Sequence, residues 1–162
     1  MTRNNTMETN IGISSENSKN ISDILNRLIS DEYILYTKTR NYHWNVVGIQ
    51  FNDLHKFFES QYDELDVIID DVAERNRALG GKAKATLAEF IGNSRLKEQP
   101  DTYPEPKTML RNLLDDHESV IRALRQDLET CTKLGDAGTS DFLTGLMEKH
   151  EKMAWMLRAF LA

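Results

Sequence analysis

The chain has 162 residues, of which 40% are hydrophobic and 28% charged, and its formal net charge is −6. This length suits one domain with a sizeable core, and the composition excludes a disordered chain. The acidic balance argues against a nucleic-acid binder that relies on bulk positive charge. The chain has one cysteine, Cys131, no bilayer-spanning apolar run and no apolar core of a signal peptide, so we expect it in a reducing cytoplasm.

The first part of the chain separates into a tail and a helical hairpin. Residues 1–20 are polar and rich in Asn, Ser and Thr, which predicts a flexible N-terminal tail ahead of a domain spanning residues 21–162. Apolar residues then recur at helical spacing and predict a first helix, which Gly48 is placed to end. A second helix is predicted over residues 53–79, before Gly80.

The second half of the chain predicts another helical hairpin after a long connection. Residues 82–105 are irregular, except for an apolar cluster at residues 87–91 that predicts a short helix. Apolar stripes predict a third helix from about Pro106 and a fourth helix after the break at Gly135 and Gly138. The pattern therefore predicts an all-α four-helix bundle with one long crossover between its second and third long helices.

The second helix has an apolar stripe on one side and a polar face on the other. The stripe comprises Leu54, Phe57, Phe58, Gln61, Leu65, Ile68, Ile69, Val72, Asn76 and Leu79. On the other face, His55 and Glu59 form one i,i+4 pair, and Asp70 and Glu74 form another, so each pair can reach one ion. A solvated acidic surface is the simpler interpretation of such a face, and the pattern alone leaves it open.

Distance keeps the two pairs apart within one chain. Glu59 and Asp70 lie about 16 Å apart along the helix axis, so one helix cannot bring both pairs to one metal ion. An antiparallel copy, related by a two-fold axis near residues 64–65, would set each pair opposite the other pair of its partner and create two identical sites. Carboxylates and imidazoles together suit Fe(II) and leave positions open for an oxidant.

A second histidine lies on the other side of the turn at Gly48. Residues about equally far from a tight helical turn lie side by side, so we expect His43 and His55 to face each other. Trp44 would either shield the site from water or pack between subunits, and both interpretations stay open.

Two blocks of sequence, "HWNVVGIQFNDLH" and "DDVAERNRALGG", resemble the signature of the DNA-binding proteins from starved cells, the Dps group of mini-ferritins. The segment "SDFLTGLMEKHEKMAWML" agrees as well. The resemblance implies a ferritin-like four-helix bundle and a hollow dodecamer built from two-fold dimers. Such a shell oxidises Fe(II) with hydrogen peroxide or dioxygen, stores the ferric mineral and protects against oxidative stress.

The resemblance also implies a catalytic iron centre shared between two chains. Its ligands would be His43, His55 and Glu59 of one chain, and Asp70 and Glu74 of the partner subunit. Glu59 falls where many relatives carry Asp, but it remains a carboxylate.

Three further positions need an interpretation. Asn76 stands on the core stripe where relatives usually carry an apolar residue, which leaves the local packing unexplained. Asp136 and Asp141 resemble the acidic residues that line iron-entry pores in relatives. Ordinary carboxylates at a helix N-terminus are the alternative for both.

The remaining histidines, His117 and His150, lie on core stripes. The chain contains no Glu-x-x-His sequence, the motif that builds iron sites inside one subunit in other ferritin-like bundles. We therefore expect both to be hydrogen-bonded histidines of the core or of an interface.

Tight DNA binding is not expected. The first twenty residues hold only Arg3 and Lys19 as basic residues, balanced by Glu8 and Glu16, whereas duplex DNA requires several Lys or Arg contacts to phosphate. Three functions therefore compete: an iron-oxidising storage enzyme, a nucleoid-associated protector that coats DNA, and a catalytically silent shell or adhesion scaffold.

Overall fold

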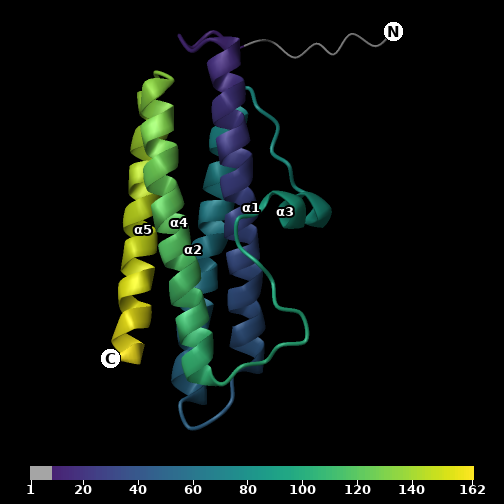
Figure 1. The fold of residues 1–162 in the computed structure, drawn as a ribbon, viewed down its shortest axis with the longest axis vertical. Helices are drawn as coiled ribbons and strands as arrows, with labels where there is room; N and C mark the ends of the chain where they lie inside the picture. The colour runs from purple at the N-terminus through teal and green to yellow at the C-terminus, as the bar shows by residue number, and fades with distance from the viewer. Residues whose placement is uncertain (1–8) are drawn as a thin grey trace.

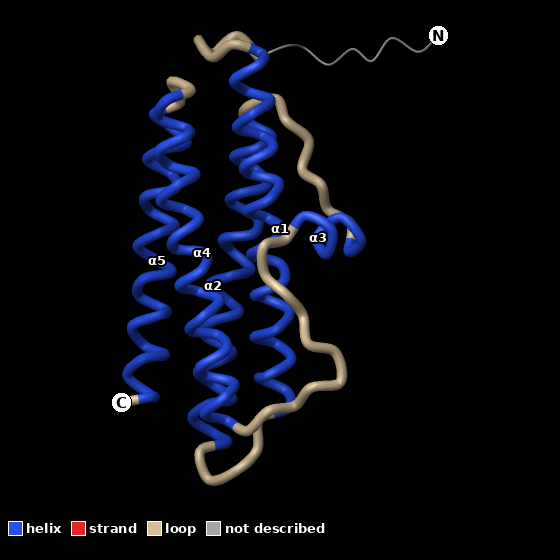
Figure 2. Tube along the Cα trace, in the orientation of Figure 1, coloured by secondary structure: helices blue, strands red, loops and turns tan. Residues whose placement is uncertain are grey.

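The computed structural model describes residues 9–162, which contain five α-helices and no strand (Figure 1). The helices are α1 (Ser15–Asn45), α2 (Phe51–Ala78), α3 (Leu87–Asn93), α4 (Pro106–Lys133) and α5 (Ala137–Leu161). The four long helices lie side by side, and the short α3 lies beside them (Figures 1 and 2). This arrangement confirms the predicted all-α bundle with a short helix in its crossover.

The bundle consists of two helical hairpins. A turn joins α1 to α2 at one end, and another turn joins α4 to α5 at the opposite end (Figure 1). The crossover runs along α1, where Phe90 of α3 stacks on Tyr33 with ring centroids 4.2 Å apart (Figure 2). Because the crossover packs on α1, it leaves the polar face of α2 exposed.

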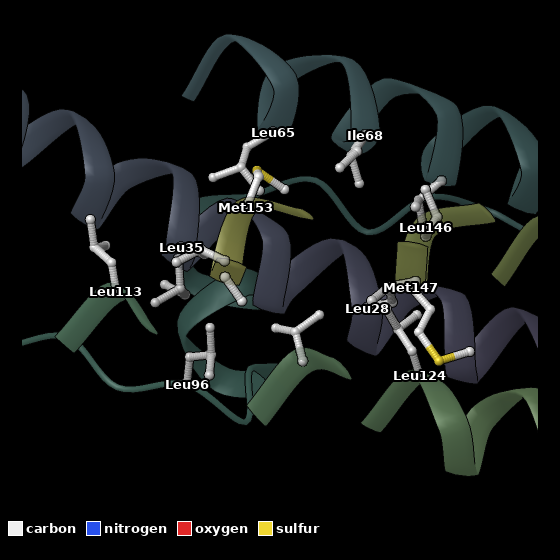
Figure 3. Close-up of a cluster of buried hydrophobic side chains, with 14 of the residues drawn as sticks. Leu28, Leu35, Leu65, Ile68, Leu96, Leu113, Leu124, Leu146, Met147 and Met153 are labelled. Carbon is white, nitrogen blue, oxygen red and sulfur yellow. The ribbon is translucent and has the colours of Figure 1, made fainter. Parts of the chain in front are cut away.

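Leucine, isoleucine and methionine side chains from all four long helices fill the centre of the bundle (Figure 3). Leu28, Leu35, Leu65 and Leu124 are 0% exposed. Burying each such side chain contributes roughly 1.5–3 kcal/mol, so this contact area holds the two hairpins together. None of the helices in the described part of the chain is long and apolar enough to cross a membrane.

Helix α1 begins at Ser15, inside the segment 1–20 that the sequence assigned to a tail. The Ser14 side chain caps the helix by accepting a hydrogen bond from the Asn17 backbone N–H at 3.1 Å. The Asn17 side chain then donates to the Leu134 carbonyl at 2.9 Å. The first turn of α1 is polar and held by hydrogen bonds, so no apolar residues recur there at helical spacing, and the sequence pattern predicted a later start of the helix. Residues 1–8 of the predicted tail lie outside the described part of the chain.

The turn between α1 and α2 uses Gly48 differently from the expectation. Helix α1 already ends at Asn45, and the Val46 N–H bonds to the Tyr42 carbonyl. Gly48 has a φ of +112°, a conformation that L side chains rarely adopt, and its carbonyl accepts from the Phe51 N–H at 3.0 Å. The glycine therefore shapes the interhelical turn and does not cap α1.

Asn76, the polar residue on the core stripe of α2, is fully buried and builds the start of the crossover. Its side-chain N–H group lies within hydrogen-bond distance of Asn26 Oδ1 at 3.1 Å and of the Lys82 carbonyl at 3.2 Å. The Asn26 amide also donates to the Lys82 carbonyl, and its Oδ1 accepts from the Lys84 N–H. A Cβ at Gly81 would collide with the side chains of Asn76 and Ser22, so the glycine lets the backbone pass these two residues. Asn76 thus holds the backbone after α2 in place through hydrogen bonds that an apolar residue could not make.

Candidate metal centre

The two histidines on either side of the interhelical turn face each other. The rings of His43, on α1, and His55, on α2, stack with centroids 3.7 Å apart and planes inclined by 20°. His43 Nδ1 lies 2.7 Å from the His55 carbonyl oxygen, and His55 Nδ1 lies 2.8 Å from the His43 carbonyl oxygen. The pairing is reciprocal, so each residue orients the ring of the other.

These contacts fix which nitrogen of each ring is free. A carbonyl oxygen only accepts hydrogen bonds, so Nδ1 carries the hydrogen and donates in both rings. When such a ring is neutral, Nε2 keeps its lone pair, the form in which imidazole binds a metal ion. A second ring nitrogen that donates to a carbonyl is also the usual support of a metal-ligating histidine.

The acidic candidates lie on the exposed face of α2. Glu59, one helical turn after His55, accepts a hydrogen bond from the Tyr62 hydroxyl at 3.4 Å. Asp70 and Glu74 lie further along the helix, and all three carboxylates are exposed. The pairs His55–Glu59 and Asp70–Glu74 therefore share one face, as their spacing predicted, and the helix keeps them apart.

One subunit does not assemble a complete centre. Within residues 9–162, no three His, Cys, Asp or Glu side chains are grouped so that they could hold a metal ion. Val67 lies on the same face of α2 between the two pairs and is 51% exposed.

A tyrosine ring packs against His43, and Trp44 follows this histidine in the chain. The Tyr62 ring meets the His43 ring edge-on, with centroids 5.2 Å apart and planes inclined by 85°. Burial and the neighbouring carboxylates of Glu59 and Asp63 raise the pKa of the Tyr62 hydroxyl, so it stays protonated and can donate. Trp44 is 64% exposed on the same side of α1.

The two acidic residues near the start of α5 have different environments. Asp136 is 3% exposed and caps α5 by accepting a hydrogen bond from the Thr139 N–H at 2.9 Å. It also pairs with Arg75 of α2 at 3.0 Å, whereas Asp141 is exposed. Within one subunit, Asp136 is thus a capping carboxylate, the alternative that the sequence left open.

The core histidines lie in a polar chain that the sequence did not reveal. His117 Nδ1 lies 3.0 Å from His150 Nδ1, and His150 Nε2 lies 3.0 Å from a carboxylate oxygen of Glu32. All three side chains are 0% exposed, and His117 Nε2 has no hydrogen-bond partner within the described residues. Glu32 comes from α1, so no spacing along α4 or α5 could have identified it.

The sequence is similar to ferritins and to named stress proteins. The ferritin family model, described as a ferritin-like domain, matches residues 22–162. A low temperature-induced protein of a Nostoc species is 44% identical over 153 residues, which cover 94% of this chain and 86% of that protein. "DNA protection during starvation protein 2" of Bacillus anthracis is 39% identical and covers 89% of this chain and 98% of its own length.

Solved structures show the same fold over nearly the whole chain. The Dps protein of Vibrio cholerae superposes with a TM-score of 0.90 at 31% identity, covering 98% of this chain and 99% of that one. Dps from Thermosynechococcus elongatus gives a TM-score of 0.87 at 32% identity and covers 91% of this chain and 94% of its own. The chain therefore belongs to the ferritin-like family and, within it, to the Dps group of mini-ferritins.

Proposed function

We propose that this protein oxidises Fe(II) at centres shared between two-fold-related subunits and stores the ferric product. The observation that carries the proposal is the reciprocal histidine pair, in which both Nδ1 atoms donate to carbonyl oxygens and leave Nε2 of each ring to bind a metal ion. The Vibrio cholerae relative is described as a ferritin-like diiron-carboxylate protein, which supports iron as the metal.

The ligand set would be completed by a second subunit. His43, His55 and Glu59 would bind iron together with Asp70 and Glu74 of the partner subunit, because α2 alone holds the two pairs too far apart. The exposed Val67 would then lie in the contact between the two antiparallel α2 helices. We further propose a hollow shell of twelve subunits, supported by the likeness to Dps proteins.

Two Fe(II) ions held together match the chemistry of hydrogen peroxide. Each Fe(II) gives up one electron, and peroxide takes two electrons and two protons as its O–O bond breaks to form two water molecules. Paired oxidation avoids the one-electron step that would release a hydroxyl radical. Dioxygen is the alternative oxidant.

The test is Fe(II) oxidation followed by ferric absorbance after peroxide is added to the assembled protein. Replacing both His43 and His55 by Ala is expected to slow the rapid phase at least about 100-fold, because second-shell losses alone cost 10–100-fold. Glu129→Ala, an exposed carboxylate of α4, serves as the control and should oxidise iron normally. Normal oxidation by the double variant would contradict the proposed centre.

The second candidate function, coating of DNA, draws support only from the names of relatives such as the Bacillus anthracis protein. The described residues supply no basic tail that could bind DNA, because Lys19 lies in α1 and pairs with Asp23 at 2.8 Å.

A further inference from the structure

Arg40 of α1 lies among three aromatic rings beside the candidate centre. Its guanidinium carbon is 4.7 Å from the ring centroid of Tyr62, 5.0 Å from that of Trp44 and 5.5 Å from that of Tyr36. Each ring presents its negative face to a cation at this range. One guanidinium group therefore holds side chains of both α1 and α2 in fixed positions.

The hydrogen bonds of Arg40 support the same conclusion. Its Nη1 donates to the Tyr36 hydroxyl at 2.6 Å, while its buried Nε has no hydrogen-bond partner within residues 9–162. The Tyr36 ring also meets the Tyr62 ring edge-on, with centroids 6.1 Å apart and planes inclined by 88°. Tyr62 is thus held by a cation and by a second aromatic ring.

Tyr62 in turn touches two of the proposed ligands. Its ring packs edge-on against His43, and its hydroxyl donates to Glu59. His43 is therefore confined by the stacked ring of His55 and by Tyr62. Metal affinity depends on ligands being held in place before the ion arrives, so these contacts bear directly on binding.

We infer that Tyr62, held in place by Arg40, is a positioning residue for His43 and Glu59 at the metal centre. The inference rests on the proposed function, because it assumes that these two residues bind the metal. The geometry separates two contributions: the ring orients His43, and the hydroxyl orients Glu59. The ring contact is the closer-packed one, because the hydroxyl hydrogen bond is long at 3.4 Å.

The experiment measures Co(II) binding to the assembled protein by titration calorimetry and by the visible ligand-field spectrum, which reports the geometry of the ligands. Tyr62→Leu removes both contacts and is expected to weaken binding 10–100-fold and to change the spectrum at saturation. Tyr62→Phe keeps the ring, so its Co(II) spectrum should match that of the unchanged protein, with an affinity within about threefold. Arg40→Gln keeps Tyr62 but removes the cation beneath it, and should weaken binding by less than Tyr62→Leu.

Phe142→Leu is the matched control, because it removes a partly buried aromatic ring near the start of α5, at the end of the bundle opposite the turn between α1 and α2. It should leave Co(II) affinity and the spectrum unchanged.

Unchanged affinity and spectrum for Tyr62→Leu would overturn the inference while leaving the centre intact. Equal losses for Tyr62→Leu and Tyr62→Phe would also overturn the role of the ring. Normal binding by His43→Ala would instead contradict the proposed centre itself, so the two failures are distinguishable.

Discussion

At the scale of single residues, the chemistry of a side chain depends on how completely the bundle surrounds it. Cys131 is the one cysteine, and it is 0% exposed in α4. Burial raises its pKa to about 11, with further contributions from the carboxylates of Asp136 and Asp127. The thiolate is the reactive form, so this cysteine is a structural residue of the core.

We predict that Cys131 resists thiol reagents in the folded protein. At pH 8 its thiolate fraction is roughly a thousandth, and its burial blocks access as well, so labelling by a disulfide reagent should be at least about 100-fold slower than in the denatured chain. The measurement is the absorbance of the released chromophore with and without denaturant. Rapid labelling of the native protein would show that α4 opens readily at this position.

At the scale of helices, buried polar residues join elements that apolar packing alone would leave free to slide. Asn76 and Asn26 link α2, α1 and the start of the crossover through hydrogen bonds to Lys82 and Lys84. The chain of Glu32, His150 and His117 likewise joins α1, α5 and α4 in the centre of the bundle. The asparagine network fixes the relative heights of α1 and α2, because a polar atom that loses its hydrogen-bond partner in the core costs about 1–3 kcal/mol.

The buried cluster of Glu32, His150 and His117 predicts that the free energy of unfolding falls in mild acid. Burial, followed by the neighbouring His150, lowers the pKa of His117 well below 6.5, so the folded state keeps this ring neutral while the unfolded chain takes up a proton. The stabilising contribution is complete above about pH 6.5, the unfolded pKa, and is lost as the pH falls toward the depressed folded value. The expected slope is about 1.4 kcal/mol per pH unit below that point.

Denaturant unfolding between pH 7.5 and 5.5 at fixed protein concentration checks this prediction. His117→Gln should flatten the slope whatever it does to the stability at pH 7.5, and His55→Gln is the control for a histidine outside the core. An equally steep slope in His117→Gln would assign the acid sensitivity to another group.

At the scale of the whole molecule, net charge governs which partners approach. The chain carries a net charge of −6, so the proposed shell would repel the phosphates of DNA. We predict no gel shift of duplex DNA at about 0.15 M salt, where surface electrostatics are screened within about 8 Å. Replacing Asn4, Asn5 and Thr6 by Lys should create salt-sensitive binding. A shift by the unchanged protein at this salt concentration would favour the DNA-coating function.

The sequence by itself determined the helical bundle, its crossover and the face of α2 that carries His55, Glu59, Asp70 and Glu74. These features follow from the spacing of residues along a helix, which a linear pattern records directly. Two sequence blocks, one across the turn between α1 and α2 and one at the end of α2, also pointed to the family to which the chain belongs.

The turn at Gly48 already placed His43 opposite His55, but only the tertiary structure decided the other contacts across helices and the atoms through which these two residues pair. The reciprocal bonds of His43 and His55, the aromatic rings around Arg40 and the partnership of Glu32 with His150 each join residues of different elements. Such contacts depend on the rotation and relative height of packed helices, which no spacing within one helix records. The start of α1 was missed for a related reason, since its first turn is held by the polar contacts of Ser14 and Asn17 and carries no apolar period.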